Sequence, residues 1–170
     1  MADARGGPSP WIVQYAGLVS AEAIVLDLAA GRGRHALFFA ERGHRVTAVD
    51  RDLSRLAVHA NIEGLQADLE DGSPWPFEGR RFGAVVVTNY LHRPVMPALL
   101  DAVAPDGVLL YETFMVGNER FGKPTRPEFL LQDGELLELV RGAFSVIAYE
   151  AGPVGDPHRA MVQRIAARRL

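Results

Sequence analysis

The stretch VLDLAAGRGRHA, residues 25–36, decides the fold of this 170-residue chain. The apolar run over residues 24–29 predicts a buried strand, and the apolar spacing over residues 34–42 predicts a helix. Between them lie Gly31 and Gly33, which allow a sharp turn and a close approach of a ligand to the backbone. A strand, a glycine turn and a helix in this order predict a nucleotide-binding loop, because the free N–H groups at a helix start can face a ligand.

Outward from this stretch, strand-like apolar runs alternate with helical patterns. Strands are expected over residues 24–29, 45–49, 62–67, 82–88, 107–113, 144–149 and 161–166. Helices are expected after the Ser9–Pro10 cap, over residues 34–42, after Asp52 (with Leu53, Leu56 and Ala60 inside), after Pro97 (with Leu99, Leu100 and Val103) and after Asp133 (with Leu136, Leu137 and Val140). The pattern predicts a doubly wound, mostly parallel Rossmann-like α/β sheet of seven strands, with helices on both faces. The last two strands have no helix between them, so we expect them to be antiparallel.

Composition narrows the class of protein. A chain of 170 residues suits one domain over residues 1–170, with residues 1–10 as a flexible N-terminus. The net charge of −3 argues against nucleic acid as a partner. The absence of cysteine excludes disulfides, thiolate catalysis and Cys-type zinc sites, and we expect no metal. No signal peptide and no membrane-spanning window is evident, which predicts a cytoplasmic protein.

Three aspartates lie on or directly after the first three predicted strands. Asp50 stands about twenty residues after the glycine turn, where an acid can accept both ribose hydroxyls of a nucleotide. Asp68 closes the third strand and can reach an adenine amino group. Asp27 would repel a pyrophosphate but suits the ammonium of a methionine moiety, directly or through water. This favours S-adenosylmethionine (SAM) over NAD, although Gly31-x-Gly33-x-x-Ala36 also matches the dinucleotide fingerprint.

These residues, together with a motif after the fourth strand, carry a family resemblance. Asp27-x-x-x-Gly31-x-Gly33, Asp50, Asp68 and Asn89-Tyr90-Leu91-His92 resemble the successive motifs of class I SAM-dependent methyltransferases. The Gly-x-Gly-Arg-His run at residues 31–35 is similar to that of small methyltransferase-domain proteins related to the tellurite-resistance methyltransferases. The resemblance implies SAM as cofactor, S-adenosylhomocysteine as product and a seven-stranded sheet with an antiparallel last strand. Ala30 and Arg32 depart from the Cys and Ser of many relatives.

The resemblance also implies which residues form the site. Cofactor binding is expected of Trp11, Asp27, Ala29, Gly31, Gly33, His35, Asp50, Arg51, Asp68, Leu69, Asn89 and Tyr90. His92 follows the fourth strand and is the candidate general base, with Tyr90 beside it; the alternative is a packed or capping histidine. A positive charge is disfavoured at a helix start, so a structural role also suits His35.

The acceptor site is expected in the segment over residues 112–127, since long loops at this edge of a sheet commonly carry function. Substrate contacts are predicted for Glu112, Phe114, Asn118, Phe121 and Arg126. Three cations, Arg120, Lys123 and Arg126, suit an anionic substrate, and a solvated loop is the alternative. No Asn/Asp-Pro-Pro-aromatic motif follows the fourth strand, so the chain does not resemble amino-methylating DNA enzymes.

The sequence therefore predicts a SAM-dependent methyltransferase that acts on a small molecule. Methyl transfer is an in-line displacement, for which alignment of the reactants supplies much of the rate. Three other functions stay open from the sequence: a NAD(P)-binding reductase, a non-catalytic SAM-binding module or partner subunit, and an RNA methyltransferase.

Overall fold

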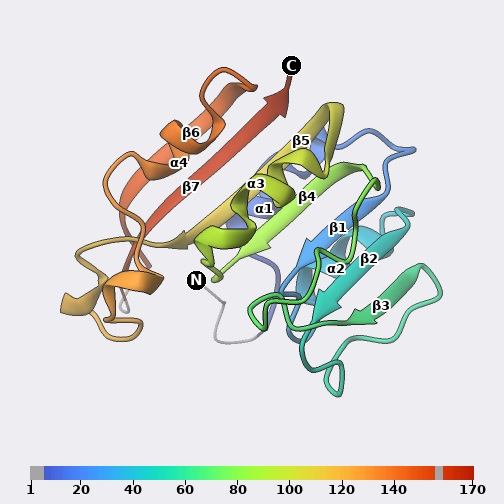
Figure 1. The fold of residues 1–170 in the computed structure, drawn as a ribbon, viewed down its shortest axis with the longest axis horizontal. Coiled ribbons are helices and arrows are strands. Elements are labelled where there is room, and N and C mark those ends of the chain that lie inside the picture. Colours follow the sequence, from blue (N-terminus) through green and yellow to red (C-terminus); the bar gives the residue numbers. More distant parts are fainter. Residues whose placement is uncertain (1–5, 156–158) are drawn as a thin grey trace.

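A single sheet organises the chain. Within residues 6–155 and 159–170, the part that the computed structural model describes, seven strands lie in the order β3-β2-β1-β4-β5-β7-β6 (Figure 1). The strands are β1 (Val25–Leu28), β2 (Val46–Asp50), β3 (Ile62–Gln66), β4 (Phe82–Thr88), β5 (Val103–Phe114), β6 (Phe144–Val154) and β7 (Ala160–Arg169). β7 runs antiparallel to both of its neighbours, β5 and β6, and the pairs from β3 to β5 are parallel. The predicted seven-stranded sheet with an antiparallel last strand is confirmed.

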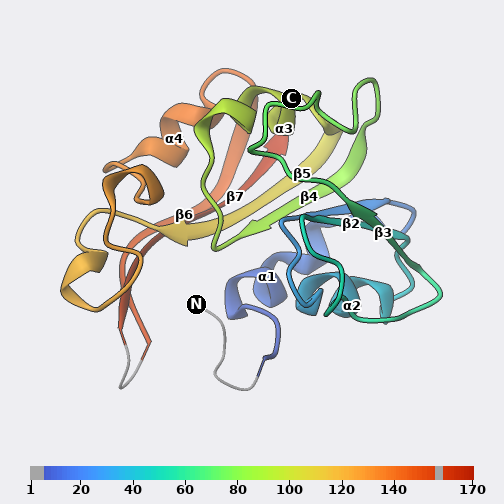
Figure 2. The same cartoon turned by 60° about the horizontal axis from the view of Figure 1, so that its bottom comes forward.

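Short helices cover both faces of this sheet. They are α1 (Pro10–Tyr15), α2 (Arg34–Ala40), α3 (Met96–Asp101) and α4 (Glu135–Val140), with single 3₁₀ turns at Ala16–Leu18, Arg93–Val95, Asn118–Arg120 and Pro127–Phe129. Figure 2 shows α1 and α2 on one side of the sheet and α3 and α4 on the other. Along β4, Val85 and Val87 belong to the core under α3 and α4, whereas Ala84 and Val86 belong to the core under α1 and α2. A strand buried on both faces explains the continuous apolar run in the sequence.

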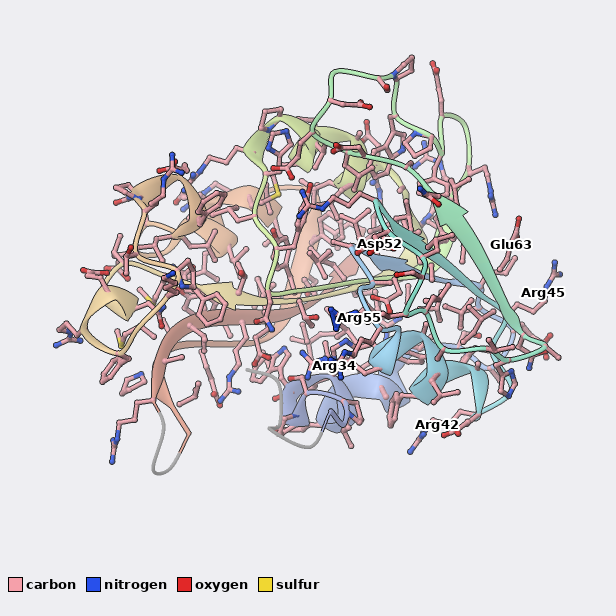
Figure 3. The ribbon with its side chains drawn as sticks, turned by 90° about the horizontal axis from the view of Figure 1, so that it is seen from below. Arg34, Arg42, Arg45, Asp52, Arg55 and Glu63 are labelled. Carbon is pink, nitrogen blue, oxygen red and sulfur yellow. The ribbon has the colours of Figure 1, made fainter. Side chains whose placement is uncertain are left out.

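The helix predicted after Asp52 is wrong. Residues 51–61 form an irregular segment instead, in which the Asp52 carboxylate accepts a hydrogen bond from the backbone of Ser54 at 2.9 Å. Figure 3 shows Asp52 and Arg55 on this segment, which runs past Arg34 and the start of α2. Leu56 packs where a side chain on Gly33 would stand, with its Cδ1 2.7 Å from the position of that missing Cβ. Packing against the glycine turn has therefore overridden the local helical pattern.

Two details near the other helices also differ from expectation. Val103 is not on α3 but begins β5, where it pairs with Phe82. Asp133 does not cap α4, because the N-cap is Gly134 in the left-handed conformation at φ 72°, which makes no side-chain cap bond. The side chain of Gln163 on β7 instead accepts the N–H of Leu136, at 3.1 Å. A tertiary partner thus satisfies the helix start.

The N-terminal segment predicted to be flexible, residues 1–10, lies only partly within the described residues. Residues 1–5 lie outside the described residues. Ser9 is fully buried and caps α1 by accepting the N–H of Trp11, at 3.2 Å. No helix among the described residues is long and apolar enough to cross a membrane.

Candidate functional site

A pocket opens where the carboxyl ends of β1, β2 and β4 meet the loop after β3. Its volume is about 410 Å³, within the range of small-molecule sites. The pocket is lined by Ala29, Asp50, Arg51, Ala67, Asp68, Leu69, Glu70, Asn89, Tyr90 and Phe129. Ligands of open α/β sheets bind at this edge, so the pocket is the candidate binding site.

Two residues of the pocket hold an uncommon backbone conformation. Ala29 and Asn89 directly follow the paired strands β1 and β4, and they have positive φ values of 54° and 52°. For Ala29, which gains no hydrogen bond from its own side chain there, the left-handed region costs about 1–2 kcal/mol. Such strain gathers at binding sites, where the surrounding structure must hold it in place.

Asp50 connects the glycine turn to the pocket. Its Oδ2 accepts the backbone N–H of Gly31 at 2.8 Å, and its Oδ1 accepts that of Asp52 at 3.0 Å. Each carboxylate oxygen has two lone pairs, so both oxygens can still accept a hydrogen bond from a ligand. Gly31 therefore acts on the site through Asp50, by fixing the orientation of its carboxylate.

The charged groups of the pocket are mainly acidic. Three carboxylates, those of Asp50, Asp68 and Glu70, line it together with one guanidinium, that of Arg51. Asp68 is held in a tight turn because its Oδ1 accepts the N–H of Glu70 at 2.9 Å. Carboxylates repel a phosphate at this range and attract a cation. The pocket thus favours an uncharged or cationic nucleoside over a dinucleotide.

Asp27 lies behind the pocket rather than in it. Its side chain is 2% exposed, and its Oδ2 accepts the N–H of Ala36 on α2 at 2.9 Å. Burial raises the pKa of Asp27 to about 7, while the bond from Ala36 acts in the opposite direction. The carboxyl group braces the glycine turn against α2, and it does not line the described pocket.

His35 and Trp11, both predicted to contact the cofactor, have internal positions. His35 is 2% exposed; its Nε2 accepts the N–H of Ser9 at 3.0 Å, and its Nδ1 lies 3.3 Å from Thr88 Oγ1. Burial lowers the pKa of His35 to about 3. Trp11 is also 2% exposed, and its indole N–H donates to the carbonyl of Ile165 at 3.2 Å. Both side chains hold α1 against the sheet and stand outside the pocket, and their contact with a cofactor stays a prediction.

The pocket contains seven of the predicted cofactor residues, namely Ala29, Asp50, Arg51, Asp68, Leu69, Asn89 and Tyr90. Gly33 stands outside it and provides the left-handed turn, at φ 74°, that leads into α2. Sequence reasoning missed Ala67, Glu70 and Phe129. Ala67 and Glu70 flank the predicted Asp68 and Leu69, so adjacency was a usable signal. Phe129 had none, since only the folded loop brings it across.

The two predicted catalytic residues lie close to one another in the chain but differ in setting. Tyr90 lines the pocket, and burial raises the pKa of its hydroxyl above the ordinary value, which keeps the hydroxyl protonated. His92 lies at the rim, where its Nδ1 is 3.2 Å from Oε1 of Glu70. The His92 side chain is 25% exposed, so it is accessible to a ligand.

The predicted acceptor residues separate into buried and exposed groups. Glu112 and Asn118 are each 1% exposed. Glu112 accepts from Ser9 Oγ at 2.7 Å and pairs with Arg164 at 3.1 Å. Asn118 accepts the N–H of Met161 at 3.0 Å and donates to the carbonyl of Pro124 at 3.0 Å. Both side chains join segments of the fold and stand outside the pocket, and their contact with a substrate stays a prediction.

Phe114, Phe121 and Arg126 also stand outside the pocket. Phe114 ends β5 opposite Val162, and Phe121 is 39% exposed. Arg126 pairs with Glu128, and its guanidinium lies 5.6 Å from the ring centre of Phe129. This internal pairing weakens the expectation of an anion site at Arg126. The loop reaches the pocket through Phe129 instead.

Comparisons with known proteins agree with this architecture. Residues 25–106 match the family model of a methyltransferase domain. TehB from Haemophilus influenzae has a TM-score of 0.77 at 18% identity, and the match covers 96% of this chain and 63% of TehB. The 1,6-didemethyltoxoflavin-N1-methyltransferase of Burkholderia thailandensis, crystallised with 1,6-didemethyltoxoflavin and S-adenosylhomocysteine, has a TM-score of 0.63 at 23% identity, covering 94% and 76%. The glycopeptide N-methyltransferase MtfA, complexed with S-adenosylhomocysteine, has a TM-score of 0.64 at 21% identity, covering 93% and 88%. No curated protein matches the sequence significantly.

The fold and the family match define the class. The chain has the class I SAM-dependent methyltransferase fold, and its residues 25–106 match the model of the methyltransferase-domain family. Within this class, the structural match to TehB agrees with the resemblance to the tellurite-resistance group that residues 31–35 indicated. This chain spans 63% of the length of TehB.

Proposed function

We propose that the chain binds SAM in the pocket beside Asp50 and transfers its methyl group to a small-molecule acceptor, releasing S-adenosylhomocysteine. The observation that carries the proposal is the Asp50 carboxylate, fixed by the N–H of Gly31 at 2.8 Å on the wall of an acidic pocket. Two structural neighbours of known activity were crystallised with S-adenosylhomocysteine, which supports the choice of nucleoside.

The residues of the pocket suit each part of this ligand. Asp50 can accept the ribose hydroxyls, and Asp68 can accept an exocyclic amino group of adenine. Leu69 and Phe129 offer apolar surface for the base. The sulfonium is a cation, which the carboxylates of the pocket stabilise, whereas the pyrophosphate of NAD would be repelled.

The chain contributes mainly by positioning. SAM, when bound, supplies a methyl group activated by its positive sulfur. Holding two reactants in line can contribute about 7–11 kcal/mol toward the barrier, so binding and orientation account for a large share of the rate. With a net charge of −3 and a pocket of three carboxylates, we favour a small molecule over nucleic acid as the acceptor.

Isothermal titration calorimetry of the purified chain with SAM, S-adenosylhomocysteine and NAD tests the proposal. Asp50→Asn should weaken SAM binding about 10- to 100-fold, as expected for hydrogen bonds to a charged group. Asp52→Asn is the matched control, because Asp52 stands two residues away and does not line the pocket; it should bind SAM within threefold of the wild type. Binding of NAD but not SAM would establish a dinucleotide protein instead. SAM binding without S-adenosylhomocysteine release for any acceptor would favour a non-catalytic module.

A further inference from the structure

A carboxylate and an imidazole meet at the rim of the pocket. Oε1 of Glu70, a pocket residue from the loop after β3, lies 3.2 Å from Nδ1 of His92, which follows β4. The Glu70 and His92 side chains are 41% and 25% exposed, so both are accessible to solvent. An exposed pair of this kind contributes little to the free energy of unfolding, so stability alone does not account for its position beside the pocket.

The pair favours one of the two ring nitrogens of His92 as the site of the proton. An unprotonated Nδ1 would direct its lone pair toward the Glu70 carboxylate oxygen 3.2 Å away and be repelled, so the proton is favoured on Nδ1. In the neutral ring, Nε2 is then an acceptor with a free lone pair. Among residues 6–155 and 159–170, Nε2 of His92 has no hydrogen-bond partner, and it is therefore available to a ligand.

The backbone around His92 is held in place. The hydroxyl of Tyr111 on β5 donates to the carbonyl of Tyr90 at 2.7 Å, which anchors the segment that leads to His92. The next residue, Arg93, is committed to Glu135 on α4 at 3.0 Å, so it does not compete for Glu70. The remaining charged groups on this side are Asp50, Arg51 and Asp68 in the pocket.

We infer that His92, oriented by Glu70, is the proton acceptor of the site, and that the methyl acceptor is a nucleophile that must lose a proton, such as a hydroxyl, thiol or N–H group. The inference rests on the proposed function. As the acceptor atom forms its bond to the methyl carbon, its proton passes to Nε2 of His92. The electron pair of the broken carbon–sulfur bond stays on the sulfur, and Glu70 accepts from the imidazolium at Nδ1. The proton then leaves to solvent.

Nitrogen-15 NMR of the histidine rings tests the role of Glu70 without any acceptor. His59 is an internal reference of the opposite tautomer, because its Nδ1 accepts the N–H of Asn61 at 3.0 Å and its proton must lie on Nε2. At a pH where both rings are neutral, the wild type should show Nδ1–H for His92, assigned by its loss in His92→Gln. Glu70→Ala, which removes the carboxylate oxygens, should move His92 toward Nε2–H, while Glu63→Ala, on the surface of β3, should not. Nε2–H for His92 in the wild type would overturn the inference.

Release of S-adenosylhomocysteine from a panel of acceptors tests the substrate class. Phenols, thiols and secondary amines lose a proton on methylation, whereas dimethyl sulfide and iodide do not. We expect release with a protic acceptor, and a kcat reduced about 100-fold or more in His92→Gln with the dissociation constant of SAM within threefold of the wild type. Release with the proton-free acceptors alone, or with no protic acceptor, would overturn the inference. Calorimetry separates these results from failure of SAM binding, and release of S-adenosylhomocysteine with the proton-free acceptors separates them from a non-catalytic module, which releases none.

Discussion

Replacing Asp27 with asparagine should change how the stability of this chain depends on pH. Asp27 is buried, and burial raises its pKa from the ordinary 3.8 to about 7. The folded state therefore holds a proton that the unfolded chain has released, and the free energy of unfolding falls as the pH rises from about 4 to 7. The difference between the two pKa values corresponds to about 4 kcal/mol, lost in full above pH 7.

A second buried group acts in the opposite direction. The pKa of His35 is lowered from 6.5 to about 3, because burial disfavours its charged form. Its Nε2 also accepts the N–H of Ser9, a bond that protonation would break. The unfolded chain takes up this proton first, so the free energy of unfolding falls as the pH drops from 6.5 toward 3, by about 5 kcal/mol in total.

The two slopes cancel in the wild type between about pH 4 and 6.5. Each group contributes about 1.4 kcal/mol per pH unit there, with opposite signs. Asp27→Asn removes the pH dependence of the unfolding free energy that Asp27 contributes and leaves the opposite dependence that His35 contributes. Asparagine can still accept the N–H of Ala36, so the contact to α2 is retained. We expect the variant to gain stability relative to the wild type as the pH rises, by about 4 kcal/mol between pH 4 and 8.

Urea unfolding of both proteins at half-unit steps of pH measures this difference. With an m-value of about 2 kcal/mol per M, the gap between the two midpoints should grow by about 2 M across the window. Other titrating groups are common to both proteins and cancel. His35→Gln serves as the control, because the difference between its urea midpoint and that of the wild type should change with pH in the opposite direction. A gap that stays constant from pH 4 to 8 would refute a buried, protonated Asp27.

Three further substitutions test the packing and the strain. Gly83→Ala places a Cβ 2.4 Å from the Cβ of Ala23 and should lower the free energy of unfolding in urea by about 1–3 kcal/mol. Gly17→Ala is the control, because the space around Gly17 is open and the added Cβ should not destabilise the fold. Glu112→Gln should cost about 1–3 kcal/mol in thermal unfolding, because Arg164 keeps Glu150 as a partner, and the exposed Glu150→Gln under 1 kcal/mol; equal losses would contradict a buried pair. Ala29→Gly should raise stability by about 1 kcal/mol, and a loss would argue against strain at φ 54°.

The sheet was predictable because each strand is encoded locally. β4 is an apolar run buried on both faces, and the predicted bounds of residues 82–88 are those observed. The helix after Asp52 failed because the decisive contact is distant: Leu56 packs over Gly33, and the N–H of Ala57 donates to the carbonyl of Arg32 at 2.9 Å. A local pattern cannot weigh such a contact against a helical turn.

The sequence by itself determined the glycine turn and most of the pocket, because Ala29, Asp50 and Asn89 follow or end strands whose carboxyl ends must meet at one edge. Only the tertiary structure decided which polar side chains face a ligand. Asp27 and His35 belong to the same motif, yet both turn into the core, whereas Phe129 crosses from a distant loop. The direction of a side chain depends on what packs against it, and that is settled only when the whole chain has folded.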